Sequence, residues 1–139
     1  MAEKMNDVKF NSLEHVGTMV SDLEKSTDFY CEMFGFEVID KIDIPYKGGI
    51  LRSNFVQLGD LVLHLEQLPE WDPAWKDGLF HHICIGVDDI HAAIGFLKSK
   101  DVKFDMENTF ILENLFGGNL ECIFLRGPDN ELIELCQRC

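Results

Sequence analysis

The chain has 139 residues, 46% of them hydrophobic and 27% charged, which is enough for one globular domain with a substantial core. Its net charge of −13 disfavours nucleic acid and anionic membrane surfaces as partners, because both bind clustered lysine and arginine. No apolar run approaches the roughly 20 residues of a membrane span, and the polar N-terminus has no signal-like apolar segment.

The cysteines predict reduced thiols in a cytoplasmic protein, because their number is odd and no paired CxxC motifs occur. Only the last two have CxxC spacing, and no second pair completes a zinc knuckle. The five cysteines are Cys31, Cys84, Cys122, Cys136 and Cys139.

After an expected N-terminal tail at residues 1–12, the first half of the chain predicts one helix among four strands. Alternating apolar residues indicate the strands, while Asp22 is suited to cap the helix and Gly35 to end it. A turn rich in proline and glycine at 45–49 and a second turn at Gly59-Asp60 separate the last three strands. The predicted elements are a strand at 13–20, a helix after Asp22, and strands at 36–44, 50–58 and 61–68.

The second half predicts the same order of elements after a linker at 69–79. This linker contains Trp71 and Trp75, which we expect to cover the core or a dimer interface rather than substrate. Each half therefore reads β-α-β-β-β, with modules at 13–68 and 80–139. The predicted elements are strands at 80–87 and 102–107 around a helix at 89–100, an irregular segment at 108–119, and strands at 120–126 and 131–137 joined by a turn at 127–130.

A sequence repeat relates the two halves. The segment from His15 to Leu23 matches the segment from His82 to Ile90 at a constant offset of 67 residues, and the same offset pairs Phe29 with Phe96. A repeat that fills half of a chain is typical of gene duplication, so the fold should contain two copies of one supersecondary unit. Each copy begins its first strand with a histidine.

Strand alternation places four potential metal ligands on one side of the predicted sheets. His15, His64, His82 and Glu134 lie opposite the aliphatic residues of their strands, on what we call the pocket face, and Glu134 aligns with His64 as His82 does with His15. Three imidazoles and a carboxylate suit a divalent Zn, Ni, Co, Mn or Fe ion. Glu66 shares the pocket face, as either a rim carboxylate or a general base.

A lone inward histidine is usually a hydrogen-bonded pocket residue, so the ligand hypothesis depends on the symmetry of the four positions. Two other histidines do not share that symmetry. His81 falls on the aliphatic face and is expected to be structural or to support His82. His91 lies on the second helix and should face solvent.

Several motifs resemble the vicinal oxygen chelate superfamily, which includes glyoxalase I, methylmalonyl-CoA epimerase, extradiol dioxygenases, fosfomycin-modifying transferases and bleomycin-resistance proteins. The resemblance extends from Leu13 to Gln137, and the sequence segments 55–59 and 81–85 are most similar to the glyoxalase I and epimerase branch. The motifs are Leu13–Gly17, Asp22–Ser26, Asp28–Tyr30, Phe34–Phe36, His81–Ile85 and Gly127–Leu135.

The resemblance implies an α+β fold in which paired β-α-β-β-β modules form a U-shaped mixed sheet around a metal pocket. His15, His82 and Glu134 match the ligand set shared by catalytic members, whereas His64 stands where the isomerases usually have Glu or Gln. Glu134, with Glu66 as a second candidate, would then move the proton.

The function implied is a metal-dependent lyase or isomerase of glyoxalase type, acting on a small-molecule substrate in a homodimer. Whether the modules pair within one chain or across the dimer stays open. One alternative is an Fe²⁺ dioxygenase using His15, His82 and Glu134, and another is a metal-free binding protein of the bleomycin-resistance type. A fosfomycin-type phosphonate pocket would need cations, for which Arg52 and Arg126 are the strand-borne candidates.

Overall fold

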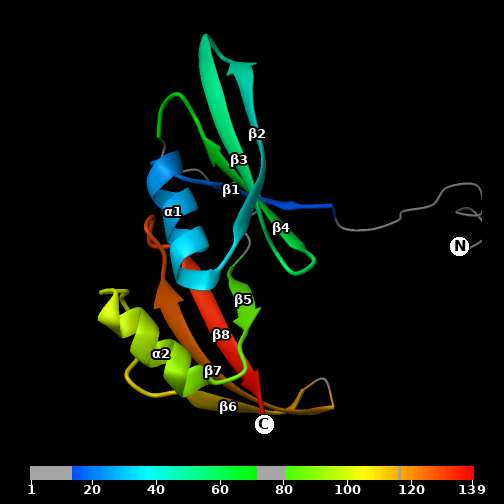
Figure 1. Ribbon diagram of the computed structural model, residues 1–139, viewed down its shortest axis with the longest axis vertical. Coiled ribbons are helices and arrows are strands. Elements are labelled where there is room, and N and C mark those ends of the chain that lie inside the picture. Colours follow the sequence, from blue (N-terminus) through cyan, green and yellow to red (C-terminus); the bar gives the residue numbers. More distant parts are fainter. Residues whose placement is uncertain (1–13, 72–80, 116) are drawn as a thin grey trace, which may run out of the picture.

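The computed structural model describes residues 14–71, 81–115 and 117–139, and shows two modules with the same order of elements (Figure 1). This order confirms the predicted α+β class and the β-α-β-β-β pattern of each half. The first module contains β1 (Val16–Met19), α1 (Leu23–Phe34), β2 (Glu37–Tyr46), β3 (Gly49–Leu58) and β4 (Leu61–Gln67). The second contains β5 (Ile83–Gly86), α2 (Ile90–Ser99), β6 (Phe110–Leu115), β7 (Gly118–Arg126) and β8 (Leu132–Arg138).

Each module forms its own four-stranded mixed sheet, with strand orders β1-β4-β3-β2 and β5-β8-β7-β6. The first strand of each pairs in parallel with the last, and the other neighbours are antiparallel. Within the described part of the chain no strand of one module pairs with a strand of the other. The expectation of a single U-shaped sheet is therefore wrong for the single chain, because β1 and β5 pair only inside their own modules.

Both helices begin where the sequence predicted, at aspartates in extended backbone conformation. The Asp22 carboxylate accepts a hydrogen bond from the Lys25 amide at 3.1 Å, and that of Asp89 accepts one from the Ala92 amide at 3.0 Å. A side-chain acceptor at this position satisfies one of the amides that a helix leaves unpaired in its first turn. Gly35 ends α1 in the left-handed conformation, at φ 79°.

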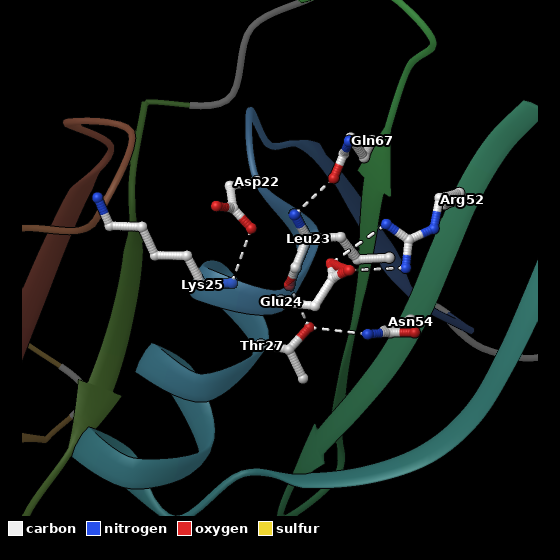
Figure 2. Close-up of polar contacts among 8 residues, drawn as sticks. All are labelled: Asp22, Leu23, Glu24, Lys25, Thr27, Arg52, Asn54 and Gln67. Atoms are coloured by element: carbon white, nitrogen blue, oxygen red, sulfur yellow. Dashed lines mark hydrogen bonds and ion pairs between the residues drawn. The ribbon is translucent and has the colours of Figure 1, made fainter.

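A glutamine at the end of each module's last strand caps the same helix a second time. The Gln67 side-chain oxygen accepts from the Leu23 amide at 2.7 Å (Figure 2), and that of Gln137 accepts from the Ile90 amide at 2.7 Å. The distances are equal because the two glutamines occupy matching positions in the repeat. Each module thus connects its final strand to the start of its helix.

The aliphatic faces of both sheets join one hydrophobic core, as the alternation predicted. In β4, Leu63 and Leu65 are 1% and 0% exposed, and in β8, Ile133 and Leu135 are 0% and 1% exposed. Full burial of each such side chain contributes about 1.5–3 kcal/mol to folding. The buried members of the core are Val20, Leu23, Tyr30, Phe36, Val56, Leu63, Leu65, Ile85, Ile90, Leu97, Ile123, Leu125, Ile133 and Leu135.

Polar contacts between α1 and the β7–β8 turn also hold the modules together. The buried Tyr30 hydroxyl donates to Glu131 Oε2 at 2.8 Å, and the Ser21 amide and hydroxyl both donate to the Asp129 carboxylate, the amide at 3.0 Å. Burial, followed by the Glu131 charge, raises the pKa of Tyr30 far above its usual value. The hydroxyl therefore stays a donor at all physiological pH values.

The predicted position of the sixth strand is wrong. Residues 102–107 form only an isolated bridge, between Phe104 and Leu125, and the sixth strand is instead β6, inside the segment expected to be irregular. The turn-forming residues of that segment serve a β-bulge and the following hairpin, at Asn114 (φ 57°) and Gly117 (φ 80°). The alternating apolar residues at 102–106 pack on the core without a continuous ladder.

Residues 1–13, 72–80 and 116 lie outside the described part, so the expected tail, Trp75 and most of the linker are not placed. Trp71 is described and is 45% exposed. In the described ranges no helix is both long and apolar enough to cross a membrane.

Candidate functional site

On the first sheet, two of the predicted ligands lie together around an aromatic ring. His15 immediately precedes β1, His64 lies in β4, and their ring centroids are 5.4 Å apart. Phe55 of β3 pairs directly with His64, and the two rings stack at 4.2 Å. The edge of the His15 ring meets the same phenyl ring at 5.4 Å. Phe55 therefore fixes the orientation of both imidazoles.

The Nε2 atom of His64 is buried and has no hydrogen-bond partner. Burial lowers the pKa of His64, assisted by the nearby His15 and opposed by the Glu66 carboxylate. The nearest Glu66 oxygen is 3.7 Å away, which is too far for a hydrogen bond. A neutral imidazole with a buried, unpaired nitrogen has the lone pair that a metal or a substrate proton requires.

Gly17 provides the space for Glu66. A β-carbon added at Gly17 would lie 3.2 Å from a Glu66 carboxylate oxygen, closer than ordinary van der Waals contact. The small residue in β1 therefore lets the carboxylate lie over the pocket face, beside His64.

The second sheet repeats this arrangement with a carboxylate in place of one histidine. His82 Nε2 lies 3.1 Å from Glu134 Oε1, and Glu134 is only 7% exposed. Phe124 of β7 pairs with Glu134 as Phe55 pairs with His64, and its ring meets the His82 ring edge-on at 5.5 Å. The sequence reading missed both phenylalanines, although they stand opposite matched ligand positions once the strands are paired.

Sulfur atoms surround Glu134. Cys84 pairs with Glu134 across the β5–β8 ladder, and Cys84, Cys122 and Cys136 line the same cavity as the carboxylate. Burial, with the Glu134 charge as a further cause, raises the pKa of Cys122 to about 12 and that of Cys84 above its usual value. Both thiols are therefore protonated at neutral pH.

The structure does not bring the two halves of the predicted ligand set together. His15, His64 and Glu66 belong to the first module, and His82 and Glu134 belong to the second. Each module has its own sheet (Figure 1). Among the described residues no three His, Cys, Asp or Glu side chains are grouped as ligands of one metal ion. A cavity of about 680 Å³ opens on the second sheet, and its described lining residues, which include His82, Glu134 and the three cysteines, all come from the second module.

The remaining histidines occupy supporting or peripheral positions. His81 Nδ1 lies 2.8 Å from His82 Nδ1, which agrees with a role in orienting His82. The side chain of His91 is 70% exposed, as predicted, and its Nε2 lies 2.9 Å from a Glu121 oxygen. His91 therefore pairs with a carboxylate of β7 and not with the predicted ligand Glu134.

Comparison with known proteins now identifies the family, because the family model described as "Glyoxalase/Bleomycin resistance protein/Dioxygenase superfamily" matches residues 12–135. The chain belongs to this superfamily. Mitochondrial methylmalonyl-CoA epimerase of Mus musculus is 35% identical over 102 residues, which cover 68% of this chain and 56% of the relative. Lactoylglutathione lyase of Schizosaccharomyces pombe is 30% identical over 152 residues, covering 93% of this chain and 48% of the relative.

A solved superfamily structure, the trypanothione-dependent glyoxalase I of Leishmania major, has a TM-score of 0.72 and 28% identity, covering 92% of this chain and 87% of that one. This likeness extends to both modules. The chain spans about half the length of the mouse and yeast relatives that it matches.

Neither arginine considered for a phosphonate site is available on the geometry observed. Arg52 forms an ion pair with Glu24 of α1 at 2.9 Å (Figure 2), and the Arg126 guanidinium contacts both Asp105 oxygens at 3.0 Å. The hydrogen bond to Arg126 lowers the pKa of Asp105, so this pair persists at neutral pH. Both guanidinium groups therefore have carboxylate partners in this structure.

Proposed function

We propose that this protein is a metal-dependent lyase or isomerase of glyoxalase type, which moves a proton beside a carbonyl of a small substrate. The observation that carries the proposal is the pair of matched half-sites, His15 with His64 and His82 with Glu134, each set against a phenylalanine. Relatives that are epimerases and lyases support the same class of reaction. A binding protein would not require such a set.

A divalent metal fits the donor atoms present. His15, His64, His82 and Glu134 would hold it, and the unpaired Nε2 of His64 is suited to face a cation. Zn, Ni, Co, Mn and Fe all accept imidazole and carboxylate ligands. When bound, the metal would supply a Lewis acid that stabilises negative charge on a substrate oxygen.

Two carboxylates, Glu134 and Glu66, are the candidates for general acid–base catalysis. Glu134 is almost buried, and its carboxylate lies 3.1 Å from His82 Nε2 beside the Cys84 and Cys122 side chains. Glu66 lies beside His64 on the other half-site and is the second candidate for carrying the proton. Holding one carboxylate on each side of the substrate would let a proton leave one face and return to the other.

The separation of the half-sites supports a homodimer in which the first sheet of one chain faces the second sheet of its partner. Each site would then combine His15 and His64 of one copy with the partner's His82 and Glu134. Exposed aliphatic side chains on the outer strands β2 and β6 suit such an interface; they include Val38, Ile39, Ile42, Ile44, Ile111 and Leu112. Sedimentation at micromolar concentration should show twice the 15.9 kDa chain mass.

Mixing two defective chains tests the shared site. His64→Ala and His82→Ala proteins should each bind no metal tightly, but refolding them together should restore roughly a quarter of the wild-type content, because half of randomly paired dimers are mixed and each mixed dimer has one intact site. A site within one chain would give no restoration. A single species at the mass of one chain would also refute the shared site.

The reaction class is tested by incubating metal-loaded protein in deuterated water with 2-oxoaldehyde–thiol hemithioacetals, acyl thioesters and catechols. Deuterium at a carbon beside a carbonyl supports proton transfer. Oxygen uptake with a catechol that depends on Fe²⁺, without exchange on the other substrates, would identify a dioxygenase instead. The cytoplasmic location stays a prediction.

A further inference from the structure

Thiols set the pocket face of the second sheet apart from that of the first. Cys84 of β5, Cys122 of β7 and Cys136 of β8 all line the cavity beside Glu134. The repeat places Gly17 at the position of Cys84, and no cysteine lies in the first module's described strands. The thiols are therefore not a by-product of the duplicated fold.

Two of these thiols are neighbours across the ladder and are accessible. Cys84 pairs with Glu134 across the parallel β5–β8 ladder, and Cys136 lies two residues further along β8 on the same face. The Cys84 and Cys136 side chains are therefore diagonal neighbours that line the same cavity. Cys84 is exposed and Cys136 half-buried, whereas Cys122 is completely buried. A dissolved oxidant therefore reaches Cys84 first, and Cys136 is the neighbour that can respond.

We propose that Cys84 and Cys136 form an oxidisable dithiol that hydroperoxides convert into an intrachain disulfide beside Glu134. The Cys84 sulfur attacks the peroxide O–O bond, giving a sulfenic acid and one water from hydrogen peroxide. The Cys136 sulfur then displaces the sulfenic oxygen as a second water. The two thiols lose two electrons and two protons, and the peroxide takes up both.

The geometry makes this disulfide reversible. A spacing of about 4.8 Å between parallel strands and a two-residue offset of about 6.6 Å separate the Cα atoms by roughly 8 Å. This is beyond the usual disulfide range, so closure requires a shift of β5 against β8. Strained and exposed disulfides are the ones that cellular thiols reduce readily.

Closure changes the surroundings of Glu134. The bridge links β5, which directly follows His82, to β8, which carries Glu134, and so constrains the distance between these two side chains. Oxidation should therefore weaken metal binding and turnover, and reduction should restore them. This consequence rests on the proposed function, whereas the disulfide itself does not.

Peptide mapping tests the disulfide directly. Trypsin places Cys84 in residues 77–98, Cys122 in 104–126 and Cys136 in 127–138, so each possible bridge gives a different linked pair. Folded protein is treated with hydrogen peroxide at mildly alkaline pH, alkylated, digested without reduction and analysed by mass spectrometry. We expect 77–98 linked to 127–138, and a single-chain band on a non-reducing gel.

The link should be lost in Cys84→Ser and Cys136→Ser but kept in Cys31→Ser, which changes a thiol on α1. A link through Cys122, a link between chains, or no link in protein whose circular dichroism is native would overturn the proposal. Unchanged metal binding in fully linked protein would overturn its regulatory consequence. Absence of activity on every substrate would refute the proposed function and leave the mapping result standing.

Discussion

Replacing Gly127 with alanine should destabilise the protein by displacing the carboxylate of Glu131. Gly127 does not have positive φ, so alanine is compatible with its backbone. An added β-carbon, however, would lie 2.5 and 2.6 Å from the two carboxylate oxygens of Glu131. The carboxylate must therefore move, and it would lose the hydrogen bonds that it accepts from the Tyr30 hydroxyl and the Asp129 amide, both at 2.8 Å.

The cost can be estimated from those two bonds. The Tyr30 hydroxyl is buried, so its loss of a charged partner should cost about 2 kcal/mol, and the more accessible Asp129 amide about 1 kcal/mol. The sum of about 3 kcal/mol corresponds to a fall of roughly 10 °C in Tm for a domain of this size. Urea and thermal denaturation followed by circular dichroism measure both quantities.

Two further variants separate this explanation from a general effect of alanine. Gly95→Ala in α2 meets no atom within 4 Å, so it should raise stability by about 0.5–1 kcal/mol through helix propensity. Tyr30→Phe should cost about 2 kcal/mol alone but little in the Gly127→Ala background, where the hydroxyl has already lost its acceptor. Additive effects of Gly127→Ala and Tyr30→Phe would refute the reasoning.

Other predictions concern the ligands and the helix caps. His82→Ala should abolish tight metal binding and His91→Ala should leave it unchanged; normal metal content in the former would contradict the ligand assignment. Gln67→Ala should lower the unfolding free energy by about 1 kcal/mol in urea denaturation, because the Leu23 amide loses its acceptor. Stability of metal-free protein should fall as pH drops below 6.5, the ordinary pKa of histidine, because burial lowers the pKa of His64 and the unfolded chain binds that proton first. A His64→Gln protein should show a shallower pH slope, and equal slopes would disprove the attribution.

Local signals in the sequence predicted most of the fold. The caps at Asp22 and Asp89 and the burial of Leu63 and Leu65 follow from spacing and side-chain chemistry alone. The sixth strand was misplaced because a β-bulge and a hairpin at Asn114 use the residues that otherwise indicate an irregular segment.

The candidate site was predictable only in part. Strand alternation predicted that His15, His64, His82 and Glu134 share the pocket face. The structure places His15 beside His64 and His82 beside Glu134. How the two sheets lie relative to each other depends on packing between modules, including the Tyr30 contact, which no periodicity encodes. The sequence therefore predicted one pocket with four ligands, whereas the structure shows two pairs on separate sheets.

The second cap on each helix has a consequence for folding order. Gln67 accepts its hydrogen bond from the amide of Leu23, which lies 44 residues earlier in the chain. Gln137 accepts one from the amide of Ile90, 47 residues earlier. Each helix therefore gains its second cap only when the last strand of its own module has docked. Closing so long a loop is entropically costly, so helix formation and strand docking should occur as one cooperative event. Native-state hydrogen exchange would then show α1 and β4 opening together, as one unit, and α2 and β8 as another.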